Sequence, residues 1–423
     1  MIRTSARLLF VLLLSSLAAF GSSPSILRAD DAASFELPAT DDGIPGAGPI
    51  RRYDWFKGLW KERRAAWATK VEQDQKAVVF LGDSITQGWG DDFQGLFPGM
   101  KAANRGISGD TTRGMLLRLQ QDVLSLNPSA VVMLMGTNDL EEQAEPQIIA
   151  DNIKLIVDEL KKHNPELPIV LCQVFPSSAT KKRPADKIRE INKLTAMKVK
   201  GDPQITVLDT WALFANEQGD AKAEEMPDLL HLNEIGYKKW AAALTPILAT
   251  QGFLETEPDQ FTPEEGFESL FNGKDLTGWG HDGKTVTPDG RYVAKNGRFI
   301  VTTPAEGSRV QQLYTTREFP GNFTLKLEFR ATPNADSGVF IRKPQLQCRD
   351  YPLAGPYKML KNYKSCDWNE LIVVVKDGVA HCTCNGEVIE EALKVPETGP
   401  IGLEGDRGQM EYRRIRISTQ PTK

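Results

Sequence analysis

The chain has 423 residues, a formal net charge of -5 and 40% hydrophobic residues. This length suits two domains, each large enough to bury a core of its own. The acidic balance provides no basic surface for nucleic acid or anionic lipid, so we expect no nucleic-acid partner.

The N-terminal region predicts export. Arg3 and Arg7 precede the apolar run of residues 8–14, and small residues follow before position 22. This order is typical of a secretory signal peptide, here residues 1–21. The apolar run is too short to span a bilayer comfortably, so we expect no stable membrane insertion and a secreted or periplasmic protein. Residues 22–50 lack apolar periodicity, which predicts a flexible leader.

Between residues 51 and 250, apolar strand-like runs alternate with helical patterns. The helical stretch 53–71 carries an aromatic stripe that includes Trp55 and Trp60, which we interpret as a lid packed on the first domain. The predicted strands are 78–81, 100–104, 130–135, 169–174 and 205–208, and the predicted helices are 115–124, 148–160, 187–200 and 233–249. Such alternation predicts a parallel sheet with helices on its faces.

Residues 251–266 separate this domain from the rest of the chain. The stretch is acidic, contains prolines and shows no hydrophobic period, which is typical of a linker. We expect it to hold the two domains close to each other without joining their cores.

Beyond the linker, in residues 267–420, the hydrophobic period changes to two. Apolar and polar side chains alternate in residues 323–330. The pairs Asp377-Gly378 and Asn385-Gly386 are typical of hairpin turns. Near the C-terminus the apolar phase changes, which predicts a β-bulge near Arg413. The second domain is therefore predicted to be an all-β sandwich.

Polar and glycine residues follow the predicted strands of the first domain. Ser84 follows the first strand, Gly109 the second and Asn138 the third, while Asp228 and His231 precede the last helix. Each of these residues alone is typical of an ordinary turn or helix cap. Because ligands and reacting groups collect at the carboxyl ends of parallel strands, the whole set indicates catalysis.

The chemistry that this set can perform is nucleophilic acyl transfer. We predict that Ser84 is the nucleophile, His231 the general base and Asp228 the carboxylate that orients the imidazole. The backbone amides of Ser84 and Gly109 and the side chain of Asn138 are predicted to form an oxyanion hole.

Residues 76–250 resemble the SGNH (GDSL-type) hydrolase superfamily. The resemblance rests, in chain order, on GDS, ISGD, GTND and DLLH, which contain the five residues above. The stretches NRGISGDTT and HLNEIGY are similar to the platelet-activating-factor acetylhydrolase catalytic-subunit-like branch and to exported carbohydrate acetylesterases. This resemblance implies a flavodoxin-like three-layer α/β/α sandwich and ester hydrolysis without a metal or cofactor.

The C-terminal part resembles the 3-keto-disaccharide hydrolase domain family, which implies a concanavalin-like jelly-roll. The resemblance rests on FESLFNGKDLTGW, SGVFIR, WNELIVVV, CNGE and GPIGLEG. Many members carry a glutamate after SGVFIR, whereas this chain has Gln345 in that segment, so a glycosidic activity lacks one expected carboxylate. The remaining candidates for acid/base or ligand groups are Glu328, Asp336, Asp350 and Glu404.

Other reactive side chains have structural interpretations. The cysteines of the second domain could form disulfides, with three possible connectivities, or remain buried free thiols: Cys348, Cys366, Cys382 and Cys384. His381 points to the opposite strand face from its cysteine neighbours, so we expect no metal site. The basic run Lys181–Arg183 is interpreted as a solvated face.

Three classes of function remain. The first is a serine esterase that removes acyl groups, acetyl above all, from carbohydrate, with the second domain binding or processing the glycan. The second is a lipid or lysophospholipid acyl esterase. The third is a lectin-like carbohydrate-binding protein with a weak hydrolase. The intact set of catalytic blocks disfavours the third class, and the sugar-associated second domain favours the first. The sequence does not indicate the oligomeric state.

Overall fold

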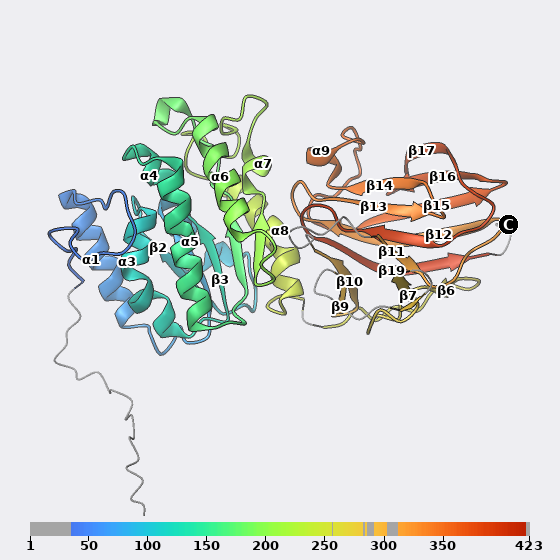
Figure 1. Cartoon of the computed structure of the whole chain (residues 1–423), viewed down its shortest axis with the longest axis horizontal. Coiled ribbons are helices and arrows are strands. Elements are labelled where there is room, and N and C mark those ends of the chain that lie inside the picture. The colour runs from blue at the N-terminus through green and yellow to red at the C-terminus, as the bar shows by residue number, and fades with distance from the viewer. Residues whose placement is uncertain (1–34, 256, 282–283, 286–291, 303–311, 420–423) are drawn as a thin grey trace, which may run out of the picture.

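The computed structural model describes residues 35–255, 257–281, 284–285, 292–302 and 312–419. The predicted signal peptide lies outside the described residues. Figure 1 shows two domains joined at the end of helix α8. None of the described helices combines the length and the apolar character that a bilayer-crossing segment needs.

The first domain is built on a parallel sheet with strand order β2-β1-β3-β4-β5. Its strands are β1 (Val78–Gly82), β2 (Ala102–Gly106), β3 (Ala130–Leu134), β4 (Ile169–Cys172) and β5 (Ile205–Leu208). Successive residues of β1 enter different cores, since Val79 and Leu81 pack on one face and Val78 and Phe80 on the other. Burial on both faces is what a strand between two helical layers requires.

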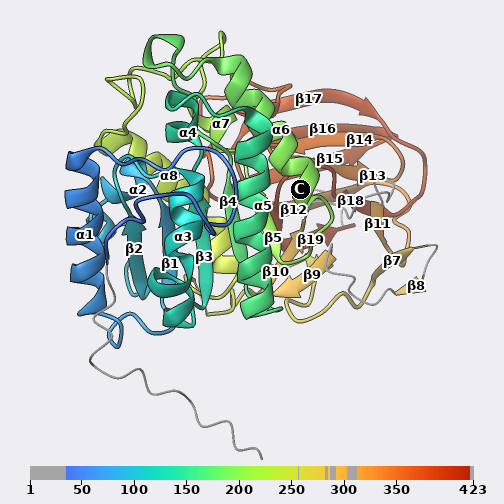
Figure 2. The same ribbon diagram turned by 60° about the vertical axis from the view of Figure 1, so that its left-hand side comes forward.

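Helices cover both faces of this sheet (Figures 1 and 2). One face carries α3 (Thr112–Asp122), α5 (Pro146–His163) and α6 (Ala185–Val199), and α1 (Asp54–Ala68) packs beside α3. The other face carries α2 (Ser84–Gln87), α7 (Thr210–Phe214) and α8 (Glu234–Thr250). The three-layer α/β/α fold is therefore confirmed.

The segment 35–50 differs from the predicted flexible leader. Arg113 of α3 donates to the carbonyl oxygens of Ile44 and Gly48 and pairs with Asp41. Asn152 of α5 exchanges two hydrogen bonds with the backbone of residue 47. A segment without apolar periodicity is thus fixed by side chains that satisfy its backbone. The rest of the predicted leader, residues 22–34, lies outside the described residues.

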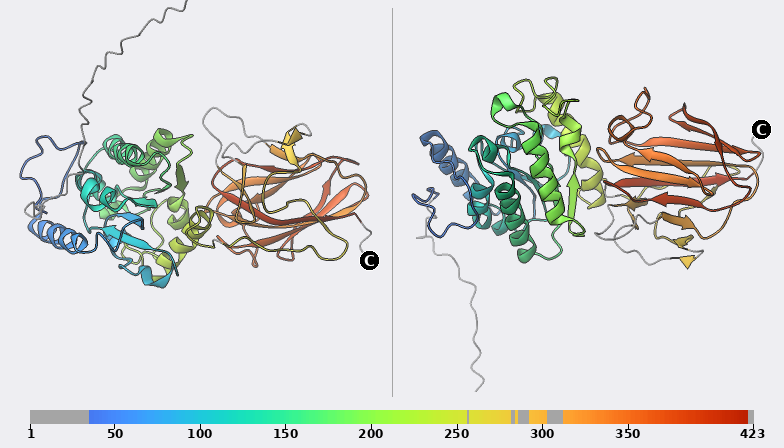
Figure 3. Two further views of the ribbon diagram at one scale, coloured as in Figure 1. Left: turned by 90° about the horizontal axis from the view of Figure 1, so that it is seen from below. Right: turned by 45° about the horizontal axis from the view of Figure 1, so that its top comes forward.

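The second domain is an antiparallel β-sandwich (Figure 3). One sheet has the order β17-β16-β15-β12-β19-β10-β9, with β6 paired to β19, and the other has the order β14-β13-β18-β11-β7-β8. The strands are β6 (Glu268–Ser269), β7 (Trp279–His281), β8 (Lys284–Thr285), β9 (Tyr292–Lys295), β10 (Arg298–Val301), β11 (Gln312–Thr315), β12 (Phe323–Ala331), β13 (Asp336–Ile341), β14 (Gln345–Arg349), β15 (Asn369–Lys376), β16 (Val379–Cys384), β17 (Glu387–Lys394), β18 (Ile401–Glu404) and β19 (Met410–Ser418).

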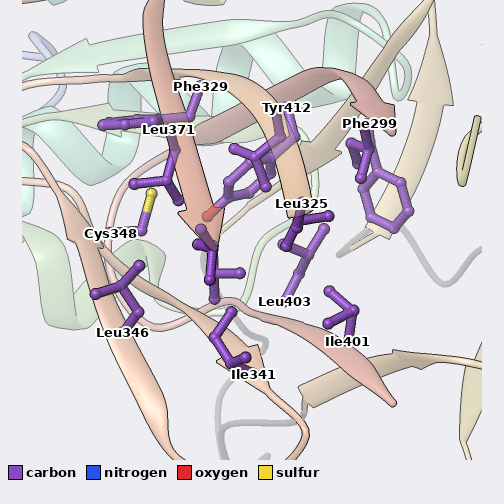
Figure 4. Packing of buried hydrophobic residues seen from close by; sticks show 14 of the residues in the cluster. Phe299, Leu325, Phe329, Ile341, Leu346, Cys348, Leu371, Ile401, Leu403 and Tyr412 are labelled. Carbon is purple, nitrogen blue, oxygen red and sulfur yellow. The ribbon is translucent and has the colours of Figure 1, made fainter. Parts of the chain in front are cut away.

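Alternating apolar residues from the two sheets fill the sandwich core. Figure 4 shows Leu325 and Tyr412 of one sheet packed with Ile341 and Leu403 of the other. The predicted hairpins are confirmed, because β15, β16 and β17 are joined at residues 377–378 and 385–386 with positive φ angles at each turn residue. The positive φ angles match the right-handed twist of the flanking strands.

The predicted bulge is confirmed in β19. Lys326 pairs with Arg416 and Glu328 pairs with Arg413, so two residues of β19 oppose one residue of β12. Arg414, inside the bulge, has a φ of 53°. This extra residue explains the change of apolar phase seen in the sequence.

The linker is held against the β-sandwich by ion pairs. Its acidic side chains contact arginines: Glu255 with Arg298 and Arg330, Asp259 with Arg414, and Glu264 with Arg416. The acidic composition that identified the linker thus serves to pack it on the second domain. The linker boundaries, 251–266, stay a prediction.

The expectation that the two cores stay separate is wrong. Cys366 and Leu353 of the second domain pack into the core cluster that also holds α8. Gln409 of the second domain donates from Nε2 to Thr250 Oγ1 at 2.9 Å at the end of this helix. A short linker that is itself packed brings the domains into direct contact, so apolar side chains at the junction become buried.

Candidate active site

Ser84 stands at the sharp turn between β1 and α2. A Cβ atom at Gly82 would lie 2.7 Å from the carbonyl oxygen of Leu134 on β3, so only glycine fits where the strand ends. Asp83 caps α2 by accepting from the backbone N–H of Ile85 at 3.0 Å. Complete burial raises the pKa of Asp83 to about 6, despite that hydrogen bond.

Ser84, His231 and Asp228 form a continuous hydrogen-bonded chain. His231 Nε2 lies 3.0 Å from Ser84 Oγ, and His231 Nδ1 lies 2.8 Å from Asp228 Oδ2. Asp228 Oδ1 also accepts from the backbone N–H groups of His231, at 2.7 Å, and Leu230, at 3.0 Å. Residues 147 positions apart in the chain are thus in direct contact.

The ionisation of Asp228 sets the roles of the two imidazole nitrogens. Partial burial acts to raise its pKa, but the hydrogen bonds from His231 and Leu230 outweigh burial and lower it to about 2. An ionised carboxylate can only accept, so Nδ1 of His231 carries the proton. Nε2 is then the acceptor that faces the Ser84 hydroxyl, as a general base requires.

Three hydrogen-bond donors belong to residues that line one cavity. The backbone N–H groups of Ser84 and Gly109 donate to no protein acceptor within the described residues. Gly109 has a φ of 86°, and a Cβ there would lie 2.6 Å from the ring of Trp55. The third donor is Asn138, whose Nδ2 gives one hydrogen to the carbonyl oxygen of Asp110 at 3.0 Å. Its second amide hydrogen remains free for a substrate oxygen.

The cavity over these groups has a volume of about 480 Å³. All five residues predicted from the sequence line it: Ser84, Gly109, Asn138, Asp228 and His231. Two of its lining residues, Asn138 and Glu141, belong to α4 (Thr137–Glu141), which is labelled in Figure 1. A nucleophile, a base with its orienting carboxylate and three donors therefore share one cavity, which suits acyl transfer.

Comparison with known proteins agrees with this geometry. Residues 80–239 match the GDSL-like Lipase/Acylhydrolase family. The platelet-activating factor acetylhydrolase IB subunit alpha1 of Rattus norvegicus is 30% identical over 194 residues, which cover 45% of this chain and 83% of that protein. The chain belongs to the GDSL-like lipase/acylhydrolase family. The alpha2 subunit of Homo sapiens is 28% identical over 204 residues, 48% of this chain and 87% of that protein.

A C-terminal part of the chain matches a second family. Residues 266–418 match the 3-keto-alpha-glucoside-1,2-lyase-like domain.

Among solved structures, a GDSL-like lipase from Bacteroides thetaiotaomicron is similar to 44% of this chain and 97% of its own, with 24% identity and a TM-score of 0.39. A putative glycosyl hydrolase from Parabacteroides distasonis is similar to 39% of this chain and 100% of its own, with 16% identity and a TM-score of 0.32.

Arg183 is a residue of the acylhydrolase site that sequence reasoning missed. The basic run 181–183 was expected to be a solvated face, which is wrong for Arg183, because it is only 3% exposed. Its guanidinium donates to the backbone oxygen of Thr137 at 3.0 Å, to Asn138 Oδ1 at 3.1 Å and to Glu141 at 2.8 Å. No sequence pattern distinguishes such a buried arginine from its exposed neighbours, since these three acceptors lie in α4, which follows β3, whereas Arg183 follows β4.

Trp55 is a second residue of the site, and its interpretation as part of a packed lid is wrong. The expectation of a packed lid holds for Phe56 and Trp60, which are fully buried. Trp55 is 54% exposed and lines the acylhydrolase cavity. Its ring is nearly parallel to that of Tyr53, with 6.3 Å between centroids. The aromatic stripe therefore has one side in the core and one side at the site.

The four acidic candidates of the second domain do not form one site. Glu328 lies in the sheet opposite to Asp336 and Glu404, and Asp350 precedes the short helix α9 (Tyr351–Ala354). Arginines pair with Glu328 and Asp336, and the backbone N–H of residue 334 donates to Asp350. Glu404 accepts from Gln345, the residue at the position where a carboxylate was expected. That amide allows the two side chains to hydrogen-bond where two carboxylates would repel each other.

The cysteines are all buried free thiols, which settles the alternative with disulfides. Burial raises the pKa of Cys382 and Cys384 to about 12, so neither is a thiolate near neutral pH. His381 between them is exposed, so the predicted strand alternation is confirmed.

Proposed function

We propose that the protein is an exported serine esterase that removes acetyl or other short acyl groups from carbohydrate. The observation that carries the proposal is the contact chain from Asp228 through His231 to Ser84, at the edge of a cavity with three free donors. Export rests on the predicted signal peptide at residues 1–21.

The geometry suits a two-step hydrolysis. Ser84 Oγ attacks the ester carbonyl carbon while His231 Nε2 takes the hydroxyl proton. The carbonyl oxygen becomes negatively charged and is stabilised by the N–H groups of Ser84 and Gly109 and by Asn138 Nδ2. His231 then gives its proton to the leaving alcohol oxygen of the sugar, which leaves an acyl group on Ser84. Water, deprotonated by the same imidazole, attacks the acyl carbon. His231 then returns that proton to Ser84 Oγ as the Oγ–acyl bond breaks and the carboxylic acid leaves.

The lining of the cavity supports a short acyl group. Trp55 and Leu230 are its large apolar side chains, and the other lining residues are polar, charged or glycine. A long acyl chain buries apolar surface at about 25 cal/mol per Å², so an enzyme that selects such chains needs an apolar channel. The related acetylhydrolase subunits carry the acetyl group in their names, which also supports a short acyl group.

The second domain supports a carbohydrate substrate. Its match is to a 3-keto-alpha-glucoside-1,2-lyase-like domain. The outer face of the sheet that contains β11, β13, β14 and β18 presents aromatic rings, amides and a carboxylate: Gln312, Tyr314, Phe340, Gln345 and Glu404. Sugars are bound by such combinations of ring faces and hydrogen-bonding groups. We propose that this face holds the glycan while the acylhydrolase domain removes its acyl groups.

A lipid acyl esterase is the competing function, because the named relatives act on platelet-activating factor. The two functions are separated by initial rates on acetylated xylo-oligosaccharides and on short- and long-acyl lipids, with Ser84→Ala as the background control. We expect the highest kcat/KM on the acetylated sugars. Higher values on the lipids would overturn the carbohydrate proposal, and binding of sugars without any hydrolysis would support a lectin-like protein.

A further inference from the structure

The charges around the acylhydrolase cavity do not cancel. Arg51 and Arg183 both contact Glu141, and Arg51 also pairs with Glu142. The Asp228 carboxylate is hydrogen-bonded to His231 Nδ1. The two other charged side chains of the lining are Lys181 and Lys182. Neither lysine has an acidic partner among the residues that the structure describes.

The backbone that carries these lysines is fixed next to the proposed oxyanion hole. Lys181 ends the short helix η3 (Ala179–Lys181), and Lys182 follows in a left-handed turn with a φ of 59°. The carbonyl oxygen of Ser178 accepts from the backbone N–H groups of Lys181 and Arg183. Arg183 in turn holds Asn138. The backbone of both lysines is therefore held one and two residues before Arg183, the arginine that contacts the proposed oxyanion donor Asn138.

Trp55 lines the same cavity as the two lysines. A Cβ added at Gly109 would lie 2.6 Å from an atom of the Trp55 ring, so the edge of the indole borders a proposed oxyanion donor. More than half of the Trp55 side chain remains exposed, and Tyr53 extends the aromatic surface beside it. Such a surface can pack against the apolar face of a sugar ring while its edges stay in water.

We infer that the preferred substrate of the acylhydrolase site is an acylated acidic sugar, whose carboxylate binds Lys181 and Lys182 while its ring packs on Trp55. This inference rests on the proposed esterase function. Unpaired cations in a partly enclosed cavity attract an anion more strongly than the same charges on an open surface. An anionic phospholipid would also satisfy the lysines, but the lining offers its chains just two large apolar side chains, those of Trp55 and Leu230.

The test compares acetylated oligogalacturonates with acetylated xylo-oligosaccharides of the same length, using the full chain. The quantity measured is the ratio of kcat/KM on the acidic sugar to kcat/KM on the neutral sugar. We expect this ratio to exceed one for the unaltered protein and to fall roughly tenfold in the double variant Lys181→Gln/Lys182→Gln, since both ion pairs to the substrate carboxylate are then lost. The ratio should also fall with added salt in the unaltered protein.

Lys162→Gln is the matched control. Lys162 is a well-exposed lysine in the last turn of α5 and does not line the cavity, so its replacement should leave the ratio as it is. An equal rate on both sugars, or a double variant that slows both to the same extent, would overturn the inference. Higher rates on acetylated anionic phospholipid micelles than on either sugar would overturn it in favour of a lipid. If the unaltered protein shows no Ser84-dependent hydrolysis of small acetates, that result would instead contradict the proposed function itself.

Discussion

Arg183 donates from Nη2 to the side-chain oxygen of Asn138 at 3.1 Å. Because this contact occupies Oδ1, the amide presents its nitrogen, not its oxygen, to the carbonyl oxygen of Asp110 and to the cavity. An amide in the reverse orientation would place an acceptor where negative charge develops. Arg183 is therefore a positioning residue, which acts on the reaction through Asn138.

Removal of this positioning contact should reduce catalysis only when Asn138 is present. We expect Arg183→Met to lower kcat on a small neutral acetate by roughly tenfold, with a smaller change in KM. In the Asn138→Ala background the same change should have little further effect, because the group that it positions is gone. The measurement is a double-mutant cycle in kcat. Fully additive effects would show that Arg183 acts by another route.

Asn138→Ala tests the oxyanion donor directly. Charge develops on the substrate oxygen mainly in the transition state, so we expect kcat to fall by about a hundredfold to a thousandfold with little change in KM. Steady-state kinetics and a melting curve on the same preparation distinguish this role from a purely structural amide. A lowered melting temperature with kcat preserved is the result expected of a structural amide.

The buried Asp83 carboxyl predicts a pH dependence of stability. Its pKa of about 6 in the folded protein lies above the ordinary value of about 4, so the folded state binds this proton more tightly than the unfolded chain. Lowering the pH from 8 to 5 should therefore increase the free energy of unfolding, by on the order of 1 kcal/mol from this group. Asp228, with a pKa of about 2, loses its contribution only at lower pH.

Asp83→Asn provides the comparison, because asparagine keeps an oxygen that can accept from the N–H of Ile85. Urea unfolding at pH 5 and pH 8 should show a smaller pH dependence for this variant than for the unaltered protein. Identical pH dependence in both proteins would contradict the elevated pKa of Asp83.

The shared core at the domain junction predicts cooperative unfolding. Since Cys366 and Leu353 pack with the core next to α8, the intact chain should show one calorimetric transition. A chain that ends at residue 255 should melt at a lower temperature, because the apolar surface covered by the second domain becomes exposed. Two independent transitions, the first unaffected by truncation, would indicate domains that are merely tethered.

The sequence predicted the parts of the fold that depend on local pattern. The hydrophobic periods gave both domain classes, and the phase change near Arg413 located a bulge that the structure places at residues 414–415. The five proposed catalytic residues could be predicted because each follows a strand or precedes a helix at one edge of a parallel sheet. These signals lie in short stretches of the sequence, so they can be recognised without knowledge of distant contacts.

The sequence did not predict the features whose position depends on contacts between residues far apart in the chain. Arg183 is buried because α4, from another βα unit, supplies three acceptors for its guanidinium. The segment 35–50 is fixed by Arg113 and Asn152, which lie more than 60 residues further along the chain. Trp55 lies on the same helix as the buried Trp60, and only the position of Gly109 makes it part of the site. None of these contacts has a periodic signature.

The assignment of Ser84 as the nucleophile is tested most directly by covalent labelling. The intact protein is treated with a phosphonate ester, and the modified peptide is identified by mass spectrometry. We expect one adduct, on Ser84, with loss of esterase activity in proportion to labelling and no adduct in Ser84→Ala. An adduct on another serine, or a Ser84→Ala protein that still hydrolyses acetate esters at the original rate, would contradict the account.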